Sequence, residues 1–286
     1  MKPAMNSLCH KASNGFTLIE MVISITVLAI LSTSAAVFLR GPISSYFDAE
    51  RRADLSDAGG LTMAKMSQEV SHAVPNSVRV VSIAGGGFYL EFLPVHSTNG
   101  VYSEGRYRST PPGPSLNDGS NSFDALGYPV TVAAGSMIVV NSHLGSVWIG
   151  NNPGVRAAGV AGVGNPVRYA PHIFQLDPNP NPEYRFQVAD APVTYACIPN
   201  AANPALGTLR RYSGYALQAA QPQNVAGAPL AAAPSKGLLA GGISACRATS
   251  FPGNLRHAQV VALALDFDNA GNRLDLYHVI RVETLP

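Results

Sequence analysis

The feature that most constrains this chain is the apolar run from Phe16 to Leu39, FTLIEMVISITVLAILSTSAAVFL. As an α-helix it would be about 36 Å long, which is enough to cross a bilayer with some tilt. A core helix of a soluble protein is the alternative, but such a helix needs a polar stripe for water, and this run has none. We therefore predict a transmembrane helix, in which Glu20 is the only ionisable residue.

The residues on either side of the run indicate its orientation. The preceding segment is short, polar and weakly basic through Lys2 and Lys11, so the positive-inside rule keeps it in the cytoplasm and predicts export of the chain after Arg40. The residues that follow the run, RGP, lack the Ala-x-Ala pattern of an ordinary secretory cleavage site. The unusual sequence stands before the run instead.

The six residues Gly15-Phe16-Thr17-Leu18-Ile19-Glu20 resemble the G/F-T-L-x-E processing site of class III signal peptides. Type IV pilins and the pseudopilins of type II secretion share this signature. The resemblance implies that a prepilin peptidase and methyltransferase cuts between Gly15 and Phe16 and methylates the new amino terminus of Phe16.

The energetics of a charge in a membrane also indicate a function for Glu20, in agreement with this resemblance. An unpaired carboxylate within hydrocarbon is costly and usually has a partner or a function. Cleavage would create a partner, because the α-amine of Phe16 is cationic near neutral pH. The resemblance implies that Glu20 of an entering subunit meets the amine of its neighbour as an assembly contact. The alternative is a carboxylate that snorkels to the lipid headgroups.

The rest of the chain predicts an α+β fold, a long N-terminal helix packed on an antiparallel β-rich globular domain. Gly41-Pro42 is expected to kink or locally melt the helix, and an apolar spacing of three or four residues then resumes and stops at Val74-Pro75. Gly59-Gly60 is expected to mark a bend or a close approach to a sheet. The predicted parts are a leader (1–15), a transmembrane or filament-core helix (16–39), its amphipathic second half (40–74) and an exported head domain (75–286).

Alternating and apolar segments predict the strands of the head domain. Residues 97–130 are interpreted as a loop with short extended pieces, and the Ala/Pro/Gln-rich residues 219–236 as a surface loop or flexible excursion. The predicted strands are a hairpin over 76–83 and 88–93, single strands at 136–141, 146–149, 172–176, 183–188, 193–198 and 207–217, and a final hairpin over 261–267 and 274–282.

Residues 68–79, together with a Tyr-Ala-Cys strand, an Arg-Arg-Tyr strand, a Ser-Ala-Cys segment and the last hairpin, resemble large minor pilins of the mannose-sensitive haemagglutinin (MSHA) pilus, of the MshO type. The resemblance implies a minor pilin in a priming or tip complex for pilus assembly, with other minor and major pilins and an inner-membrane assembly platform as partners. The precursor would span the inner membrane once with a periplasmic C-terminal domain, and later reach the pilus. Whether it acts in cell adhesion stays open.

Two other functions remain as alternatives. The first is a type II secretion pseudopilin, and the second is an uncleaved, signal-anchored periplasmic enzyme or binding protein. No G-x-S-x-G, Walker or HExxH motif is present, so we predict neither an enzyme nor a cofactor. The net charge of +2 and the placement of Arg210 and Arg211 on opposite faces of a strand disfavour nucleic-acid binding.

Two small sets of residues remain. Cys197 and Cys246 lie beyond the apolar run and far from Cys9, which fits either a disulfide in an oxidising compartment or two unrelated buried thiols. Asp266, Asp268 and Asp275 near the last turn form a weak calcium candidate, although turn chemistry explains the same residues and their spacing is not that of an EF-hand. No metal is therefore predicted.

Overall fold

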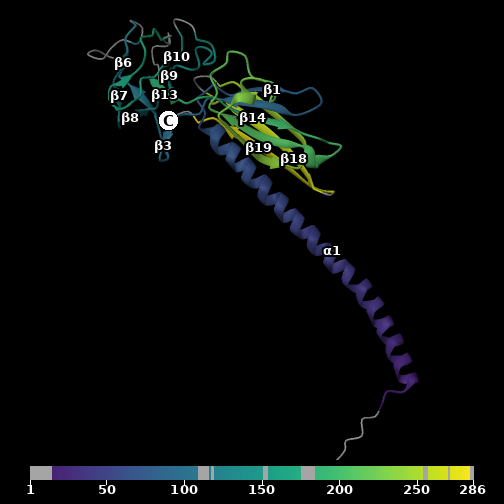
Figure 1. The fold of residues 1–286 in the computed structure, drawn as a ribbon. Helices are drawn as coiled ribbons and strands as arrows, with labels where there is room; N and C mark the ends of the chain where they lie inside the picture. Colours follow the sequence, from purple (N-terminus) through teal and green to yellow (C-terminus); the bar gives the residue numbers. More distant parts are fainter. Residues whose placement is uncertain are drawn as a thin grey trace, which may run out of the picture. The chain divides into compact units, whose positions relative to one another are not determined.

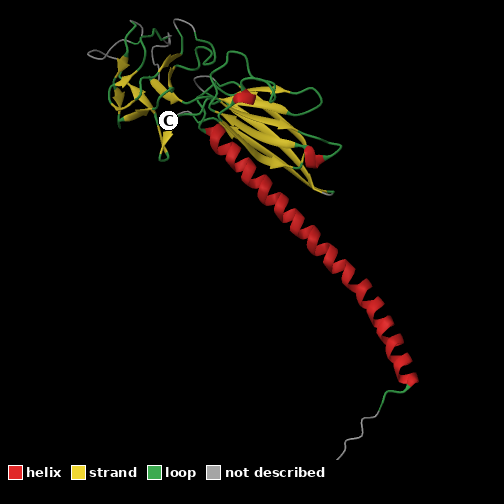
Figure 2. Ribbon diagram, viewed as in Figure 1, coloured by secondary structure: helices red, strands yellow, loops and turns green. Residues whose placement is uncertain are grey.

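One helix, α1, runs from Leu18 to Ser71 and is followed by antiparallel strands, which confirms the α+β prediction (Figures 1 and 2). The chain divides into two units, Met1–Arg51 and Arg52–Pro286, and α1 begins in the first and ends in the second. The computed structural model describes residues 15–108, 116, 119–150, 154–174, 184–253, 257–269 and 271–283.

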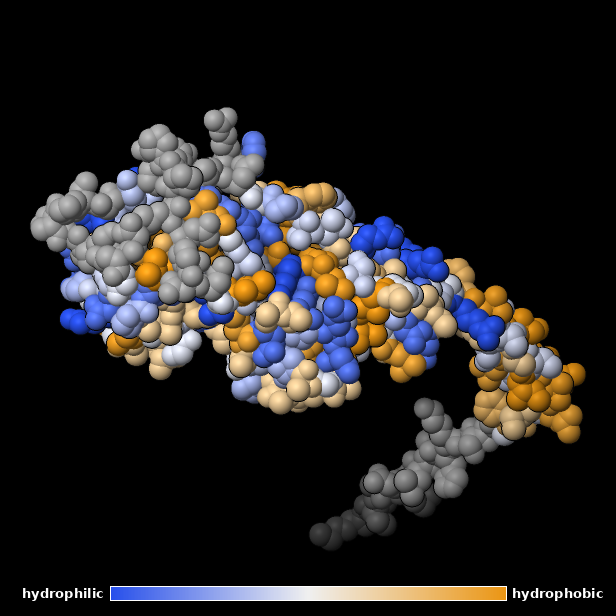
Figure 3. All heavy atoms as spheres, turned by 90° about the horizontal axis from the view of Figure 1, so that it is seen from above, coloured by the Kyte–Doolittle hydropathy of each residue, from blue (hydrophilic) through white to orange (hydrophobic). Residues whose placement is uncertain are grey.

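Every residue of α1 in the first unit is exposed, and an 18-residue window is long and apolar enough, by length and composition, to cross a membrane. In Figure 3 the part of α1 next to the grey N-terminal residues is predominantly hydrophobic. The local melting expected at Gly41-Pro42 is wrong, because α1 continues through both residues. Pro42 removes a single backbone donor, and the hydrogen bonds of the turns on either side sustain the helix.

The helix ends at Ser71, and the first of its buried residues is Leu55. Beyond it, two antiparallel sheets make up the main body of the second unit. The first and last hairpins confirm the prediction, with Phe267 opposite Leu274 in the last one. The first sheet has the order β1 (Arg79–Ser82), β2 (Phe88–Phe92), β14 (Val193–Ile198), β15 (Thr208–Ser213), β16 (Ser235–Gly241), and the second the order β17 (Ile243–Phe251), β18 (Val260–Asn269), β19 (Asn272–Arg281).

Between β2 and β14 the chain forms a third sheet with a core of its own, built around Phe123, Ile138 and Phe186. The short extended pieces expected within the loop 97–130 are present as β5, β7 and further short strands, but the joining of β5 and β7 to this sheet was not predicted. The five strands are β10 (Arg156–Ala158), β9 (Met137–Val140), β13 (Arg185–Ala189), β5 (Glu104–Tyr107) and β7 (Ala125–Leu126); the short pairs are β3 (Ser97–Thr98) with β4 (Val101–Tyr102), β6 (Ser122–Phe123) with β12 (Val167–Arg168), and β8 (Val130–Val132) with β11 (Gly162–Gly164).

Two predicted strands do not form. Val147 and Trp148 are buried in a turn, and Phe174 makes only an isolated bridge to Gly154, while residues 175 and 176 lie outside the described part of the chain. Both segments are apolar because they fill cores next to this third, inserted sheet: Phe174 packs in the cluster around Phe123, and Val147 and Trp148 pack in a second cluster. A short apolar run has no periodicity that separates a strand from a buried turn.

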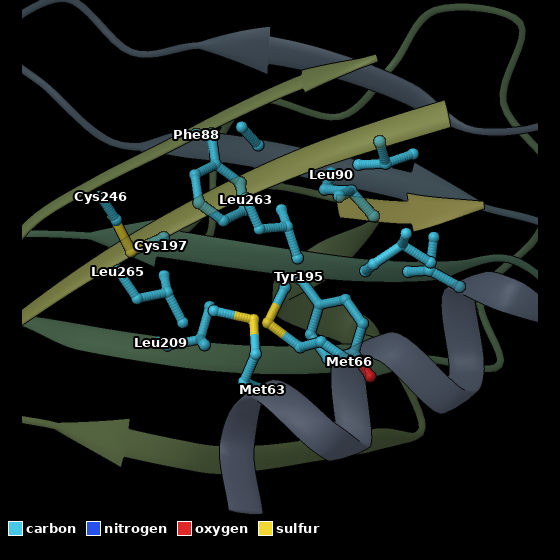
Figure 4. Packing of buried hydrophobic residues seen from close by; sticks show 14 of the residues in the cluster. Met63, Met66, Phe88, Leu90, Tyr195, Cys197, Leu209, Cys246, Leu263 and Leu265 are labelled. Carbon is cyan, nitrogen blue, oxygen red and sulfur yellow. A yellow bond between two sulfur atoms is a disulfide. The ribbon is translucent and has the colours of Figure 1, made fainter. Parts of the chain in front are cut away.

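The largest hydrophobic cluster lies between α1 and the two main sheets, with Met63 and Met66 packed among Tyr195, Leu209 and Leu263 (Figure 4). A disulfide joins Cys197 on β14 to Cys246 on β17 and so ties the two sheets together. Of the two interpretations of these cysteines, the structure therefore has the disulfide.

The Ala/Pro/Gln-rich segment 219–236 is not the flexible excursion that its composition indicates. Leu230 and Ala233 are buried in a cluster with Tyr89 and Tyr212, and they cover the face of the first sheet that points away from the main cluster. The Gln221 side-chain amide also donates to the Tyr89 carbonyl at 2.9 Å. Both faces of β2 are covered as a result, which explains why every residue of this strand is buried.

The two adjacent glycines of α1 have different surroundings. A Cβ atom on Gly59 would lie 2.9 Å from Leu276 and 3.1 Å from Leu274, whereas one on Gly60 would meet nothing within 4 Å. The predicted close approach to a sheet is therefore confirmed at Gly59.

These surroundings predict opposite effects for one substitution. Gly59→Leu should lower the free energy of unfolding by about 1–3 kcal/mol through overpacking. Gly60→Leu should raise it by up to about 1 kcal/mol, because glycine is a poor helix former. Chemical unfolding of the two full-length variants in detergent measures both changes, and equal effects would contradict the packing at Gly59.

Glu69 on α1 is the centre of a polar network at the helix–sheet contact. Its carboxylate lies 2.8 Å from Lys65 Nζ and accepts hydrogen bonds from Tyr195 Oη at 2.8 Å and Arg211 Nε at 2.9 Å. Burial by itself raises the pKa of this carboxyl, but the bonds from Lys65, Arg211 and Tyr195 outweigh it and lower the pKa below the ordinary value. Arg211 is thus occupied within the fold, while Arg210 is exposed.

The direction of this pKa shift predicts a dependence of stability on pH. A carboxyl with a lowered pKa in the folded state stabilises the fold above its ordinary pKa, and this contribution is lost as the pH falls through the folded-state value. Glu69→Gln should therefore cost about 1–3 kcal/mol at pH 7 and progressively less below pH 4.5. Asp57→Asn, at an exposed position of α1, is the matched control and should change stability little at either pH.

Candidate processing and assembly site

The predicted cleavage site lies just before the helix. Gly15, Phe16 and Thr17 have no helical structure, and α1 begins at Leu18. A Cβ atom on Gly15 would meet nothing within 4 Å, and the Phe16 side chain is 76% exposed. The peptide bond between them is accessible, and no contact among the described residues requires a glycine at position 15.

Thr17 fixes the point at which the helix starts. Its hydroxyl accepts a hydrogen bond from the backbone N–H of Glu20 at 3.3 Å, and its carbonyl accepts one from the N–H of Met21 at 3.2 Å. This is the arrangement of an N-cap residue followed three positions later by glutamate. This role of Thr17 was not among the predictions, although the T-x-x-E spacing signals it.

Glu20 stands in the first turn of α1 with an exposed side chain. Among the described residues, no hydrogen bond or ion pair engages its carboxylate. The partial positive charge of a helix N-terminus favours a carboxylate at this position. The side chain is therefore placed where an anion is tolerated and is left free for a cation from outside the described chain.

The other polar side chains of the apolar run are satisfied within the helix. Ser24, Ser32 and Ser34 each donate to the backbone carbonyl four residues earlier, at 2.7 to 2.9 Å, and Thr26 donates to the Ile23 carbonyl. Hydroxyl groups bonded in this way add little cost in a hydrocarbon environment. Glu20 thus differs from every other polar residue of the run.

The calcium candidates are used by the last hairpin. Asp268 accepts hydrogen bonds from the Gly271 N–H and from Arg273, while Asp266 is opposite Asp275 on the neighbouring strand. Ala270 of this turn lies outside the described residues. Within the described ranges, no group of three His, Cys, Asp or Glu side chains is placed to hold a metal ion.

A buried ionic network, which the sequence did not reveal, connects the first sheet with Trp148, which lies in a turn between β9 and β10. Glu91 is completely buried and accepts hydrogen bonds from Tyr215 and Arg79, and the Arg79 guanidinium lies 3.8 Å from the centre of the Trp148 ring. Burial raises the pKa of Glu91, which Tyr215 and Arg79 only partly offset. The only sequence signal is a glutamate inside an otherwise apolar strand.

Comparison with known proteins identifies the N-terminal region alone. The family model described as the prokaryotic N-terminal methylation motif matches residues 10–36. No curated protein and no solved structure matches the chain. The matched motif and the apolar helix support a type IV pilin-like or pseudopilin protein that is anchored in a membrane, processed by a prepilin peptidase and assembled with other subunits.

The surroundings of Gly15 predict that a substitution there affects processing and not folding. Gly15→Val should abolish cleavage before Phe16 when the chain is co-expressed with a prepilin peptidase, because a branched side chain would obstruct the peptidase and not the fold. Intact-mass measurement reports cleavage, and unfolding of the head domain reports stability. A fully cleaved Gly15→Val chain would contradict the assignment of the site.

Proposed function

We propose that this chain is a non-enzymatic minor pilin that takes part in the assembly of a type IV pilus, of the MSHA type, within a priming or tip complex. The observation that carries the proposal is the Glu20 carboxylate, which has no partner among the described residues and stands in the first turn of an apolar helix, four residues after the residue that cleavage would make the new amino terminus. A cationic amino terminus of a neighbouring subunit would neutralise such a carboxylate when the helix enters an assembly.

The size of the exported part supports a position near the tip. Residues 52–286 form one unit in which the third sheet is added to the two main sheets. A bulky head has more room at the end of a filament than along a closely packed shaft. The MSHA type is supported by the order of a Tyr-Ala-Cys strand, an Arg-Arg-Tyr strand, a Ser-Ala-Cys strand and the last hairpin, which are β14, β15, β17 and β18–β19.

A pseudopilin of a type II secretion system would carry the same N-terminal motif. Deletion of the gene distinguishes the two functions, because loss of pili supports the minor pilin and loss of secreted enzymes supports the pseudopilin. Location by electron microscopy with a tagged chain tests the position, and an even distribution along the shaft at high copy number would contradict a place at the tip.

Substitution of Glu20 tests the assembly contact. Glu20→Gln and Glu20→Ala should leave cleavage after Gly15 largely intact and reduce incorporation into filaments at least about tenfold, since losing a desolvated charge pair costs more than 1.4 kcal/mol. Glu50→Gln on the same helix, also exposed, is the matched control. Incorporation is measured by immunoblots that compare the amount of the chain in sheared filaments with the amount in whole cells. Normal incorporation of both Glu20 variants would contradict the assembly contact and would favour a carboxylate that only reaches to the lipid headgroups.

A further inference from the structure

The outer face of the sheet formed by β17, β18 and β19 is uncovered in the part of the chain that the structure describes. On β18, the odd-numbered residues from Val261 to Phe267 are buried against α1 and the first sheet. The even-numbered residues therefore point to the other side of the sheet and are only partly buried. Among the exposed side chains beside them are Phe251 at 55%, Tyr277 at 71% and Val279 at 50%.

The strand register arranges this outer face in rows. One row places Ala264 of β18 between Arg247 of β17 and Tyr277 of β19. A second row, with Val260 in the centre, has Phe251 on the β17 side and Arg281 on the β19 side, and the row between these two is Thr249, Ala262 and Val279. Each outer row thus carries an arginine on one flank and an aromatic ring on the other, with small residues along β18 between them.

These four flanking side chains have few contacts within the described residues. No aromatic contact or cation–π contact involves Phe251, Tyr277, Arg247 or Arg281, and Arg247 interacts only electrostatically, with Asp266. Exposed aromatic rings and arginines are the residues that interfaces favour. The face therefore holds two arginines and two aromatic rings that make no cation–π or ring contact with any other described residue.

We propose that this face binds the same face of a second copy of the chain, related by a twofold axis that runs along β18. Such a rotation lays β17 of each copy against β19 of the other. Arg247 then meets the partner's Tyr277, and Phe251 meets the partner's Arg281, which gives four cation–π pairs in all. Ala262 and Ala264 lie at the axis and allow the two sheets to approach closely.

The direction of α1 selects this axis over one that crosses the strands. Within the second unit the helix and β19 run in the same direction, and an axis along β18 therefore keeps the α1 segments of the two copies parallel. Two chains anchored by their N-terminal helices in one membrane require this, and an axis across the strands would reverse one of them. The contacts that show the direction are Arg52 with Asn272, Gly59 near Leu276, Ser67 with His278 and Ser71 with Glu283.

The same geometry gives one unfavourable contact that makes the proposal specific. Asp266 is one row beyond Ala264 on β18, so it would lie near the axis and opposite the partner's Asp266. Arg247 of the same copy acts on its carboxylate electrostatically, and Asp275 on β19 adds to the negative charge there. Removal of the Asp266 charge should therefore tighten the association, whereas a basic partner surface would predict the opposite.

Self-association of the full-length chain in detergent micelles provides the test. Arg247→Ala and Tyr277→Ala should each raise the dimer Kd about tenfold or more, since each removes two of the four symmetric pairs. Asp266→Asn should lower the Kd. The matched control is Arg210→Ala, an exposed arginine of β15, which should leave the Kd unchanged. Circular dichroism and an intact Cys197–Cys246 disulfide verify that each variant is folded.

Cross-linking tests the axis itself. Removal of the leader also removes Cys9. In the Ala264→Cys variant, a short bis-maleimide should then link the cysteine at position 264 of one copy to the same cysteine of the second copy. Thr249→Cys and Val279→Cys should link efficiently to each other when mixed and poorly when alone. Three results would overturn the proposal. The chain could stay monomeric at all concentrations, it could form a dimer whose Kd does not change with Arg247→Ala and Tyr277→Ala, or it could associate only with a different subunit. Cleavage at Gly15 and incorporation of Glu20 variants do not depend on any of these results.

Discussion

The contact between the second half of α1 and the two main sheets organises the structure. Six residues of the helix, from Leu55 to Val70, are buried there, and the sheets close around them. Gly59 permits this approach because any side chain at that position would meet Leu274 and Leu276. Helix, first sheet and last hairpin share one hydrophobic cluster, so a disturbance at this contact would reach all three.

Polar and covalent links lie at the edges of this cluster and act on different parts of it. Glu69 holds α1 to Tyr195 and Arg211 of the first sheet, and the disulfide holds β14 to β17. Arg79, with Glu91 on one side and Trp148 on the other, connects the first sheet to the turn between β9 and β10. Different interactions therefore hold α1 to the first sheet, the first sheet to the second sheet, and the first sheet to the segment that contains Trp148.

The first part of α1, up to about Leu39, is not stabilised by packing on the sheets. The apolar run extends around all sides of this part, and none of its residues is buried among the described residues, so its surface suits hydrocarbon or a contact with other subunits. Serine and threonine hydroxyls bond back to the helix, whereas the Glu20 carboxylate does not. A helix that satisfies its own backbone and leaves one charge free is suited to a change of environment from lipid to a protein assembly.

The N-terminal helix, the processing motif and the first and last β-hairpins could be predicted from the amino-acid sequence, because these depend on patterns within a few adjacent residues. It also showed that Cys197 and Cys246 were available to pair. Two features became visible only in the folded chain: residues 219–236 pack on the first sheet, and β5 and β7 join a third sheet. Both depend on contacts between residues far apart in the chain, where burial outweighs the local preference of a loop-like composition. The helix, in contrast, continues through the exposed Pro42 on the backbone hydrogen bonds of its own neighbouring turns.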